Sequence, residues 1–313
     1  MPFKRVPQKF TSAIKEVALG TGDTLITLGG ENVYPLYGFD EPLKNPPKVG
    51  VEVSDLGPNR DLPGIAAFYA GATKVADAAK KACQMPGADF VSLVLESADP
   101  NGQDKPIEDC VALCKEVAAA ITLPLVIQGC KNVEKDGKLF VKIAEALQGK
   151  NVLLMSAKED NHKAIAVAAV QAYGQKIGAE SSVDINLAKQ LNVLISQLGI
   201  SGNNVAMNVG SSAAGYGFEY VASTMDRIKG AALSQNDAML QMPIITPVAG
   251  DAWSVKESVV SEEDFPEWGP VEQRGIDMEI VTAASALAAG SNAVILRHPV
   301  SVATVSKLVK ELV

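Results

Sequence analysis

The feature that most constrains the fold is one unit repeated eight times from Lys48 onward: a short, β-branched apolar run followed by a segment with helical spacing of apolar residues. Most of the runs are continuously apolar, which is typical of parallel strands covered on both faces. The expected strands are residues 49–53, 90–95, 125–128, 152–156, 181–184, 205–208, 244–247 and 294–296.

The segments between these runs have the apolar period of an α-helix. Pro63 and Pro106 fall near expected helix starts, and Gly199 and Gly290 follow expected helix ends. Eight strand–helix alternations across residues 48–313 predict an α/β protein with a (β/α)8 TIM barrel, for which about 250 residues is typical. A doubly wound open sheet is the alternative.

Residues 1–47 precede the repeat and are interpreted as an N-terminal extension. Residues 25–30 predict a strand followed by a Gly-Gly turn, and residues 34–39 concentrate aromatic side chains. The extension could plug the bottom of the barrel or bind a partner. A second irregular stretch, residues 249–270, contains both tryptophans, and long loops of this kind are often functional.

Composition excludes several classes of protein. There are 28 basic and 36 acidic residues, and no basic block offers a footprint for nucleic acid. No apolar run approaches the roughly 20 residues that cross a membrane. Lys15 and Glu16 interrupt the segment where a signal peptide would be apolar, so we expect a cytoplasmic protein.

The 4 cysteines form no C-x-x-C pair and no cluster with histidine. A disulfide framework, a zinc site and an iron–sulfur cluster are therefore not expected in this chain. Cys110 and Cys114 are four residues apart on a predicted helix, in line with apolar residues. We expect both thiols to be buried as small hydrophobic groups.

TIM-barrel active sites are built from the loops at the carboxyl ends of the strands. These ends hold acids and amides, but no nucleophile has an obvious adjacent base and no spacing suggests a metal site, so we predict neither catalytic residues nor metal ligands. Arg297 is expected to pair with a carboxylate of an adjacent strand, such as Glu96 or Asp55. The polar residues at these ends are Ser54, Asp55, Glu96, Asp99, Asn101, Gln128, Cys130, Lys158, Asp184, Asn186, Asn208, Gly210, Arg297 and His298.

Residues 208–217, Asn-Val-Gly-Ser-Ser-Ala-Ala-Gly-Tyr-Gly, form the most informative local sequence. Glycine and serine expose backbone N–H groups and let a ligand approach closely, just before an expected helix N-terminus. The segment is neither a Walker A motif nor a dinucleotide fingerprint. Contact with a ligand and a merely tight turn between strand and helix both remain open.

Asp160-Asn161-His162 matches the first half of the D-x-H-x-x-G motif that ligates cobalt. Ile165 stands where that motif has glycine, and a helix-capping role for Asp160 explains the segment better. We therefore expect that His162 is not a cobalt ligand.

Four segments together resemble a known family: residues 24–30, 34–40, 52–55 and 247–253. They are similar to the small subunit of the corrinoid iron–sulfur protein, and the similarity covers essentially the whole chain. That family is the barrel subunit of the methyl carrier in the reductive acetyl-CoA (Wood–Ljungdahl) pathway of carbon fixation.

The resemblance implies a non-catalytic subunit of a heterodimer. The large subunit of this family carries the iron–sulfur cluster and the corrinoid-binding domain, and cobalamin lies at the interface. Methyl passes from a methyltetrahydrofolate:corrinoid methyltransferase to acetyl-CoA synthase/carbon monoxide dehydrogenase. The surface expected to meet the corrinoid comprises Asn208, Gly210, Ser211, Ser212, Gly215, Tyr216, Asp251 and Trp253.

Two other functions remain open at this point. Pterin-dependent methyltransferases hold folate with Asp and Asn at strand ends, and Asp184, Asn186 and Asn208 could do so here, although no proton donor with an evident partner accompanies them. A free-standing phosphate-binding barrel enzyme rests only on the Gly/Ser loop. Purified alone, a folate enzyme should bind methyltetrahydrofolate, a sugar-phosphate enzyme should bind phosphate esters, and a carrier subunit should bind neither.

Overall fold

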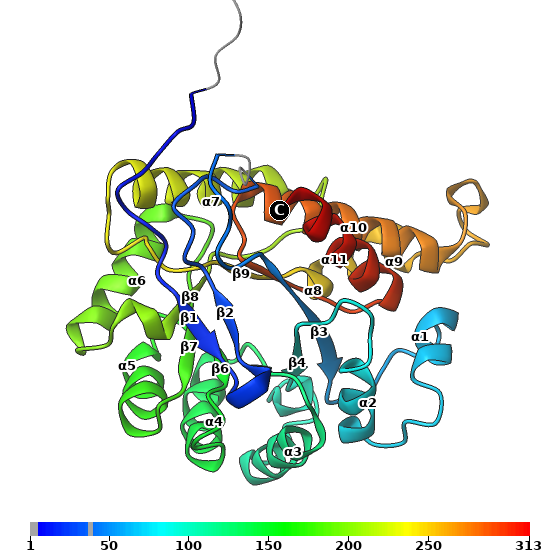
Figure 1. The fold of residues 1–313 in the computed structure, drawn as a ribbon. Coiled ribbons are helices and arrows are strands. Elements are labelled where there is room, and N and C mark those ends of the chain that lie inside the picture. Colours follow the sequence, from blue (N-terminus) through cyan, green and yellow to red (C-terminus); the bar gives the residue numbers. More distant parts are fainter. Residues whose placement is uncertain (1–5, 37–39) are drawn as a thin grey trace, which may run out of the picture.

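The computed structural model describes residues 6–36 and 40–313, and their dominant feature is a barrel of eight parallel strands (Figure 1). The strand order is β8-β7-β6-β5-β4-β3-β10-β9. A parallel bridge between Met207 and Ile244 joins the two ends of this order. The TIM-barrel prediction is confirmed. The barrel strands are β3 (Lys48–Ser54), β4 (Phe90–Val94), β5 (Leu125–Gln128), β6 (Leu153–Ala157), β7 (Lys176–Glu180), β8 (Val205–Asn208), β9 (Ile245–Pro247) and β10 (Ala293–Leu296).

Helices surround the strands and cover their outward-facing apolar side chains. The outer layer also contains a π-helical turn, η3 (Val167–Ala172), that directly continues helix α5 (His162–Ala166). The α-helices are α1 (Pro63–Phe68), α2 (Val75–Ala82), α3 (Ile107–Ala120), α4 (Val133–Ala146), α5 (His162–Ala166), α6 (Ile185–Gln197), α7 (Phe218–Ser234), α8 (Val248–Ala252), α9 (Lys256–Val259), α10 (Val271–Ala289) and α11 (Pro299–Leu312).

One predicted strand lies in the wrong place. Residues 181–184 are a loop, and the fifth barrel strand is β7, directly before them. The Asp184 side chain explains the loop, because it accepts hydrogen bonds from the backbone N–H groups of Asn186 and Leu187 and so begins α6. The charged ends of β7, Lys176 and Glu180, hid this strand from a search for continuous apolar runs.

The N-terminal extension plugs the bottom of the barrel. It forms an antiparallel hairpin of β1 (Val17–Leu19) and β2 (Ile26–Leu28), drawn in blue across the strands in Figure 1. The hairpin packs against the inward-facing apolar residues near the amino ends of the barrel strands. Residues 37–39 of the aromatic stretch lie outside the described residues. The packing partners of the hairpin are Phe90, Val126, Leu153, Met155, Ala206, Ile245, Ala293 and Ile295.

A buried polar cluster fixes the same extension to the barrel. Lys229 of α7 donates to Glu31 at 2.7 Å and to Asn292 at 2.8 Å, and Asn292 also donates to Glu31 at 2.7 Å. All three side chains are buried. Burial by itself would raise the pKa of Glu31, but the Lys229 charge and the hydrogen bonds from Asn292 and Lys229 hold this pKa below its ordinary value.

Gly50 of β3 provides a test of packing inside the barrel. A Cβ atom at this position would lie 2.2 Å from the Phe90 ring. Gly50→Ala is therefore expected to lower the free energy of unfolding by about 1–3 kcal/mol through overpacking. Gly230, inside α7 with no neighbour within 4 Å of its Cβ position, is the control. Gly230→Ala should raise the free energy of unfolding by about 1 kcal/mol. Chemical denaturation measures both changes, and changes of the same sign in the two variants would contradict the expectation.

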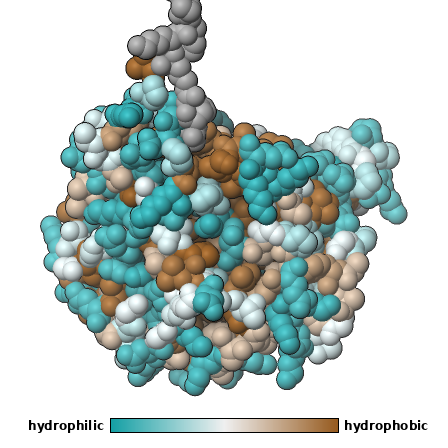
Figure 2. All heavy atoms as spheres, in the orientation of Figure 1, coloured by the Kyte–Doolittle hydropathy of each residue, from teal (hydrophilic) through white to brown (hydrophobic). Residues whose placement is uncertain are grey.

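The segment around α9 and the turn η5 (Pro266–Trp268) projects from the barrel as an arm, orange in Figure 1. Its tip is largely hydrophilic, whereas the barrel face around the hairpin mixes hydrophilic and hydrophobic residues (Figure 2). Within the described residues, no helix combines the length and the apolar character needed to span a bilayer. Residues 249–270, which the sequence predicted to be irregular, contain most of the short helix α8, the short helix α9 and the turn η5.

Candidate functional site

The carboxyl ends of the strands surround an open cavity, the mouth, of about 460 Å³. Of the polar strand-end residues selected from the sequence, eight line it: Glu96, Asp99, Gln128, Cys130, Lys158, Asn208, Gly210 and Arg297. Ser54, Asp55, Asn101, Asp184, Asn186 and His298 do not. The TIM-barrel rule therefore located this cavity, although it could not decide which strand-end residues face inward.

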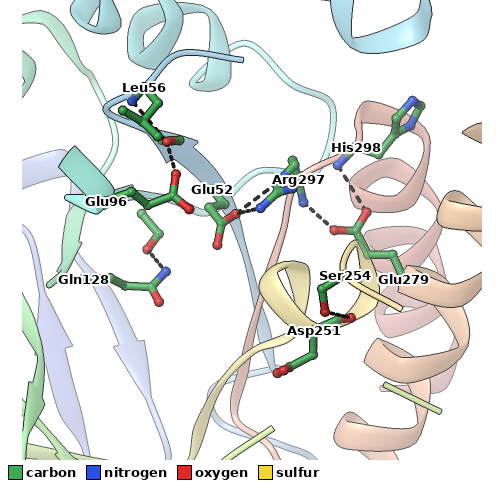
Figure 3. A network of polar contacts seen from close by, with 11 residues as sticks. Glu52, Leu56, Glu96, Gln128, Asp251, Ser254, Glu279, Arg297 and His298 are labelled. Carbon is green, nitrogen blue, oxygen red and sulfur yellow. Dashed lines mark hydrogen bonds and ion pairs between the residues drawn. The ribbon is translucent and has the colours of Figure 1, made fainter. Parts of the chain in front are cut away.

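An ion pair crosses one side of the mouth. Arg297 donates from Nη2 and Nε to Oε1 of Glu52, at 2.6 and 3.0 Å (Figure 3). The predicted pairing of Arg297 with a carboxylate of an adjacent strand is confirmed, because β3 pairs with β10, but the partner is Glu52 and neither of the two examples, Glu96 and Asp55. The strand register pairs Leu296 with Val51, so the next residues, Arg297 and Glu52, lie side by side inside the barrel.

The two rejected partners accept other hydrogen bonds. Asp55 accepts from the backbone N–H of Ser97 at 3.0 Å and from the Ser97 hydroxyl. Glu96 accepts from the Ser54 hydroxyl. Sequence reasoning missed Glu52 because it lies within a strand; its signal was a charged residue alternating with Val51 and Val53.

A buried carboxylate behind the mouth holds the end of β10. Glu279 of α10 accepts from the backbone N–H groups of Arg297 at 2.6 Å and His298 at 3.2 Å (Figure 3). Burial raises the pKa of Glu279, although these hydrogen bonds oppose the shift. Glu279 therefore positions the backbone from which the Arg297 side chain extends.

His298 itself is buried away from the mouth. Its Nε2 lies 3.1 Å from Glu272, and its Nδ1 accepts from the backbone N–H of Val300 at the start of α11. Burial lowers the pKa of His298 more than Glu272 raises it. The side chain therefore hydrogen-bonds its neighbours and caps a helix.

The opposite side of the mouth contains a second ion pair and a buried acid. Nζ of Lys158 lies 3.0 Å from Oε1 of Glu180. Asp136 accepts from the backbone N–H of Cys130 at 2.9 Å and from its thiol at 3.2 Å. Burial, reinforced by Asp136, raises the pKa of Cys130 to about 11, so the thiol stays protonated at neutral pH.

The Gly/Ser loop reaches the mouth through its first residues. Asn208, Gly210 and Ser211 line the cavity, and Asn208 accepts from the backbone N–H of Gly210 at 3.2 Å. Gly210 has φ +91°, a conformation that glycine adopts without strain. The Ser211 hydroxyl oxygen is buried and has no hydrogen-bond partner among the described residues.

The remaining residues expected to meet the corrinoid separate into two groups. Asp251 lines the mouth, below the Glu52–Arg297 pair in Figure 3. Ser212, Gly215 and Tyr216 do not line it; Ser212 donates to the backbone oxygen of Tyr216, and the Tyr216 hydroxyl donates to Glu257 at 2.6 Å. These three residues form the outer part of the loop.

Trp253 lies inside the protein. It is only 8% exposed, it stacks on His298 with ring centroids 5.9 Å apart, and it occupies the space above Gly275. In this conformation its ring does not face the mouth. Its position in α8 and the turn that follows, one of the short helices that the sequence did not indicate, accounts for the burial.

The segment around His162 also differs from the expectation. The capping residue of α5 is Asn161, and Asp160 is not the cap. The Asn161 side chain accepts from the backbone N–H of Lys158 and makes no capping hydrogen bond to the helix. His162 Nδ1 lies 2.6 Å from the backbone oxygen of Glu159.

Cys110 and Cys114 are both buried.

The charge of the mouth favours ligands that donate hydrogen bonds. Six carboxylates line it against three cationic side chains. Several of the carboxylate oxygens accept no hydrogen bond from residues 6–36 and 40–313, so an N–H or O–H group of a ligand can reach them. The acids are Glu52, Glu96, Asp99, Asp136, Glu180 and Asp251, and the cations are Lys131, Lys158 and Arg297.

Comparison with known families gives a match over residues 16–288 to the CO dehydrogenase/acetyl-CoA synthase delta subunit family. The chain belongs to this family. The resemblance to the small subunit of the corrinoid iron–sulfur protein is thereby confirmed.

Curated relatives support the assignment. The acetyl-CoA decarbonylase/synthase complex subunit delta of Archaeoglobus fulgidus is 31% identical over 319 residues, covering 98% of this chain and 70% of the relative. The subunit of the same name from Methanopyrus kandleri is 34% identical over 288 residues, covering 91% of this chain and 70% of the relative.

Among solved structures, dihydropteroate synthases are similar in fold. The enzyme from Xanthomonas albilineans with 4-aminobenzoic acid gives a TM-score of 0.56 at 13% identity, covering 95% of this chain and 98% of that enzyme. The enzyme from Burkholderia cenocepacia gives 0.56 at 13% identity, covering 96% and 97%. At this identity the similarity concerns the barrel alone.

Proposed function

We propose that this delta-family subunit caps and shields a corrinoid that carries a methyl group from a methyltetrahydrofolate:corrinoid methyltransferase to acetyl-CoA synthase. The relatives are named as subunits of an acetyl-CoA decarbonylase/synthase complex, and we place this chain in a complex of the same kind. A larger partner subunit would hold the iron–sulfur cluster and the corrinoid-binding domain, and cobalamin would lie between the two subunits.

The observation that carries the proposal is the match between the mouth and the rim of a corrinoid. That rim bears carboxamide groups, which donate N–H hydrogen bonds, and the mouth has an excess of carboxylate acceptors. The unpartnered Ser211 hydroxyl adds a polar group that a ligand could satisfy. When bound, the corrinoid would supply the cobalt that holds the methyl group.

The chain's own residues would bind and shield. Gly210 would let the flat macrocycle approach the backbone, and Asn208, Ser211 and Asp251 would hydrogen-bond its amides. Large apolar side chains stand exposed on the loops and helices that follow the carboxyl ends of the strands, where a partner subunit could cover them and exclude water. These side chains are Leu56, Val183, Tyr216, Tyr220 and Val259.

The folate-binding alternative is less well supported by the geometry. Of the three amide and acid residues expected to hold folate, Asn208 alone lines the mouth. Asp184 is engaged as the cap of α6, and Asn186 lies in the first turn of that helix. A folate would therefore meet one of the three expected groups.

The test compares two serines whose hydroxyl groups are both unsatisfied. The Ser211 and Ser181 hydroxyl oxygens are both buried and have no hydrogen-bond partner in the part of the chain that the structure describes, but of the two only Ser211 lines the mouth. In the complex reconstituted with the large subunit, Ser211→Ala should weaken cobalamin binding about tenfold, as expected for one lost hydrogen bond. Spectral titration measures the affinity.

Ser181→Ala is the control and should bind cobalamin like the unchanged protein. Native mass spectrometry should show a 1:1 heterodimer for both variants, which separates corrinoid binding from assembly. If Ser211→Ala and Asp251→Ala both bind cobalamin with unchanged affinity, the corrinoid contacts another part of the barrel.

A further inference from the structure

A second, smaller cavity, the side cavity, adjoins the mouth between the end of β3 and helices α1 and α2. Its volume is about 170 Å³, which is several times the roughly 30 Å³ that a water molecule occupies in the liquid. It shares Glu52, Glu96 and Arg297 with the mouth. A small group in the side cavity can therefore belong to a larger molecule that lies in the mouth.

Tyr69 brings an unsatisfied donor to the side cavity. The residue is 3% exposed, and its hydroxyl is buried with no hydrogen-bond partner within residues 6–36 and 40–313. Burial raises the pKa of Tyr69 far above its ordinary value, so the hydroxyl keeps its proton. Buried hydroxyls nearly always have a partner, and an exception requires an explanation.

The other side of the cavity presents free acceptors. Both hydrogen bonds from Arg297 go to Oε1 of Glu52, and the Ser54 hydroxyl donates to Oε2 of Glu96. Among the hydrogen bonds of the described residues, Oε2 of Glu52 and Oε1 of Glu96 accept none. Figure 3 shows these two carboxylates next to each other, with Glu52 inside β3 and Glu96 in the turn that follows the neighbouring strand β4. The cavity thus combines one free donor with two free acceptors.

This combination favours a neutral group that accepts one hydrogen bond and donates two. A carboxylate group could accept from Tyr69, but it would bring a third negative charge to a site with a single guanidinium. An ammonium group would suit Glu52 and Glu96, but it offers no acceptor for the Tyr69 proton. A primary carboxamide has both an acceptor oxygen and two N–H donors.

We propose that the side cavity binds a primary carboxamide, whose oxygen accepts from Tyr69 and whose NH2 group donates to Glu52 and Glu96. The occupant that we infer rests on the proposed function, because a corrinoid in the mouth bears carboxamides on its rim. One of them would enter the side cavity while the macrocycle stays in the mouth. A free small amide is the other source of the same chemistry.

The first experiment tests the carboxamide class without a corrinoid. The chain is labelled with 3-fluorotyrosine, and Tyr69→Phe assigns the 19F signal of Tyr69. Propionamide should shift this signal, whereas equal concentrations of propionate and propylammonium should not. No shift with propionamide, or an equal shift with propionate, overturns the proposal. Tyr69→Phe removes only an unpaired hydroxyl, so its melting temperature should be unchanged or higher.

The second experiment identifies the occupant in the assembled two-subunit protein. Cobalamin is compared with derivatives in which one rim carboxamide is hydrolysed to a carboxylate. One positional isomer should bind about tenfold more weakly than cobalamin, because its new carboxylate faces Glu52 and Glu96, and Tyr69→Phe, which removes the donor to the carboxamide oxygen, should lower the affinity for cobalamin itself. Tyr173→Phe, in the half-buried residue after η3, is the matched control and should leave this affinity unchanged.

The outcomes of the two experiments are distinguishable. If all isomers bind equally while propionamide still shifts the Tyr69 signal, the corrinoid as occupant is overturned and a free amide takes its place. If this chain has no influence on corrinoid binding at all, the proposed function fails, and the propionamide titration still decides the carboxamide class.

Discussion

Replacing Lys229 with methionine is expected to lower the free energy of unfolding by about 3–5 kcal/mol, the cost of leaving a buried charge without its partner. Glu31 would remain buried beside Asn292, with one hydrogen bond in place of two and no opposing charge. Chemical denaturation measures the change. Lys307→Met is the control, because Lys307 and Glu311 are exposed, 3.7 Å apart, and worth less than about 1 kcal/mol.

The pH dependence of stability supplies a second readout for the same variant. The folded-state pKa of Glu31 is lowered, so its contribution to stability is present above the unfolded pKa and is lost as pH falls through the folded pKa. Without Lys229, burial acts with less opposition and favours the protonated acid. Acidification should then recover part of the stability that Lys229→Met loses; a loss that grows on acidification would contradict this account.

The second large effect is expected at Glu279. Glu279→Leu would leave the backbone N–H groups of Arg297 and His298 buried without an acceptor, at about 1–3 kcal/mol each. We expect a total loss of about 2–6 kcal/mol of stability. Because the backbone of Arg297 would also shift, cobalamin binding in the reconstituted complex should weaken.

Asp277 offers a matched control for this substitution. It lies on the same helix, is exposed, and accepts a hydrogen bond from Gln273 on the surface. Asp277→Leu should change the free energy of unfolding by no more than about 0.5 kcal/mol. A loss below about 1 kcal/mol in Glu279→Leu would show that water or another group replaces the carboxylate.

The barrel could be predicted because its signal is repeated. Eight apolar runs separated by helical segments allow few architectures, and one misplaced strand did not disturb the count. That error arose where local chemistry outweighed apolar character: β7 begins and ends with charged residues, and Val183 lies in the loop that Asp184 organises as a helix cap.

The site could be predicted only in part. The rule for strand ends located the mouth, and eight of the residues that it selected line the cavity. It could not find Glu52, because an inward-facing acid within a strand becomes visible only from the barrel register. It also could not foresee that Trp253 is buried, since packing between α8 and α10 depends on contacts distant in sequence. The family came from the resemblance of particular segments.

The buried cluster of Glu31, Lys229 and Asn292 also determines an order of events during synthesis. Glu31 leaves the ribosome about 200 residues before Lys229 and about 260 before Asn292, at roughly 5–20 residues per second. For at least ten seconds the hairpin exists without the partners that neutralise its acid. The plug can therefore seat stably only at the end of translation, which makes closure of the barrel floor a late step of folding.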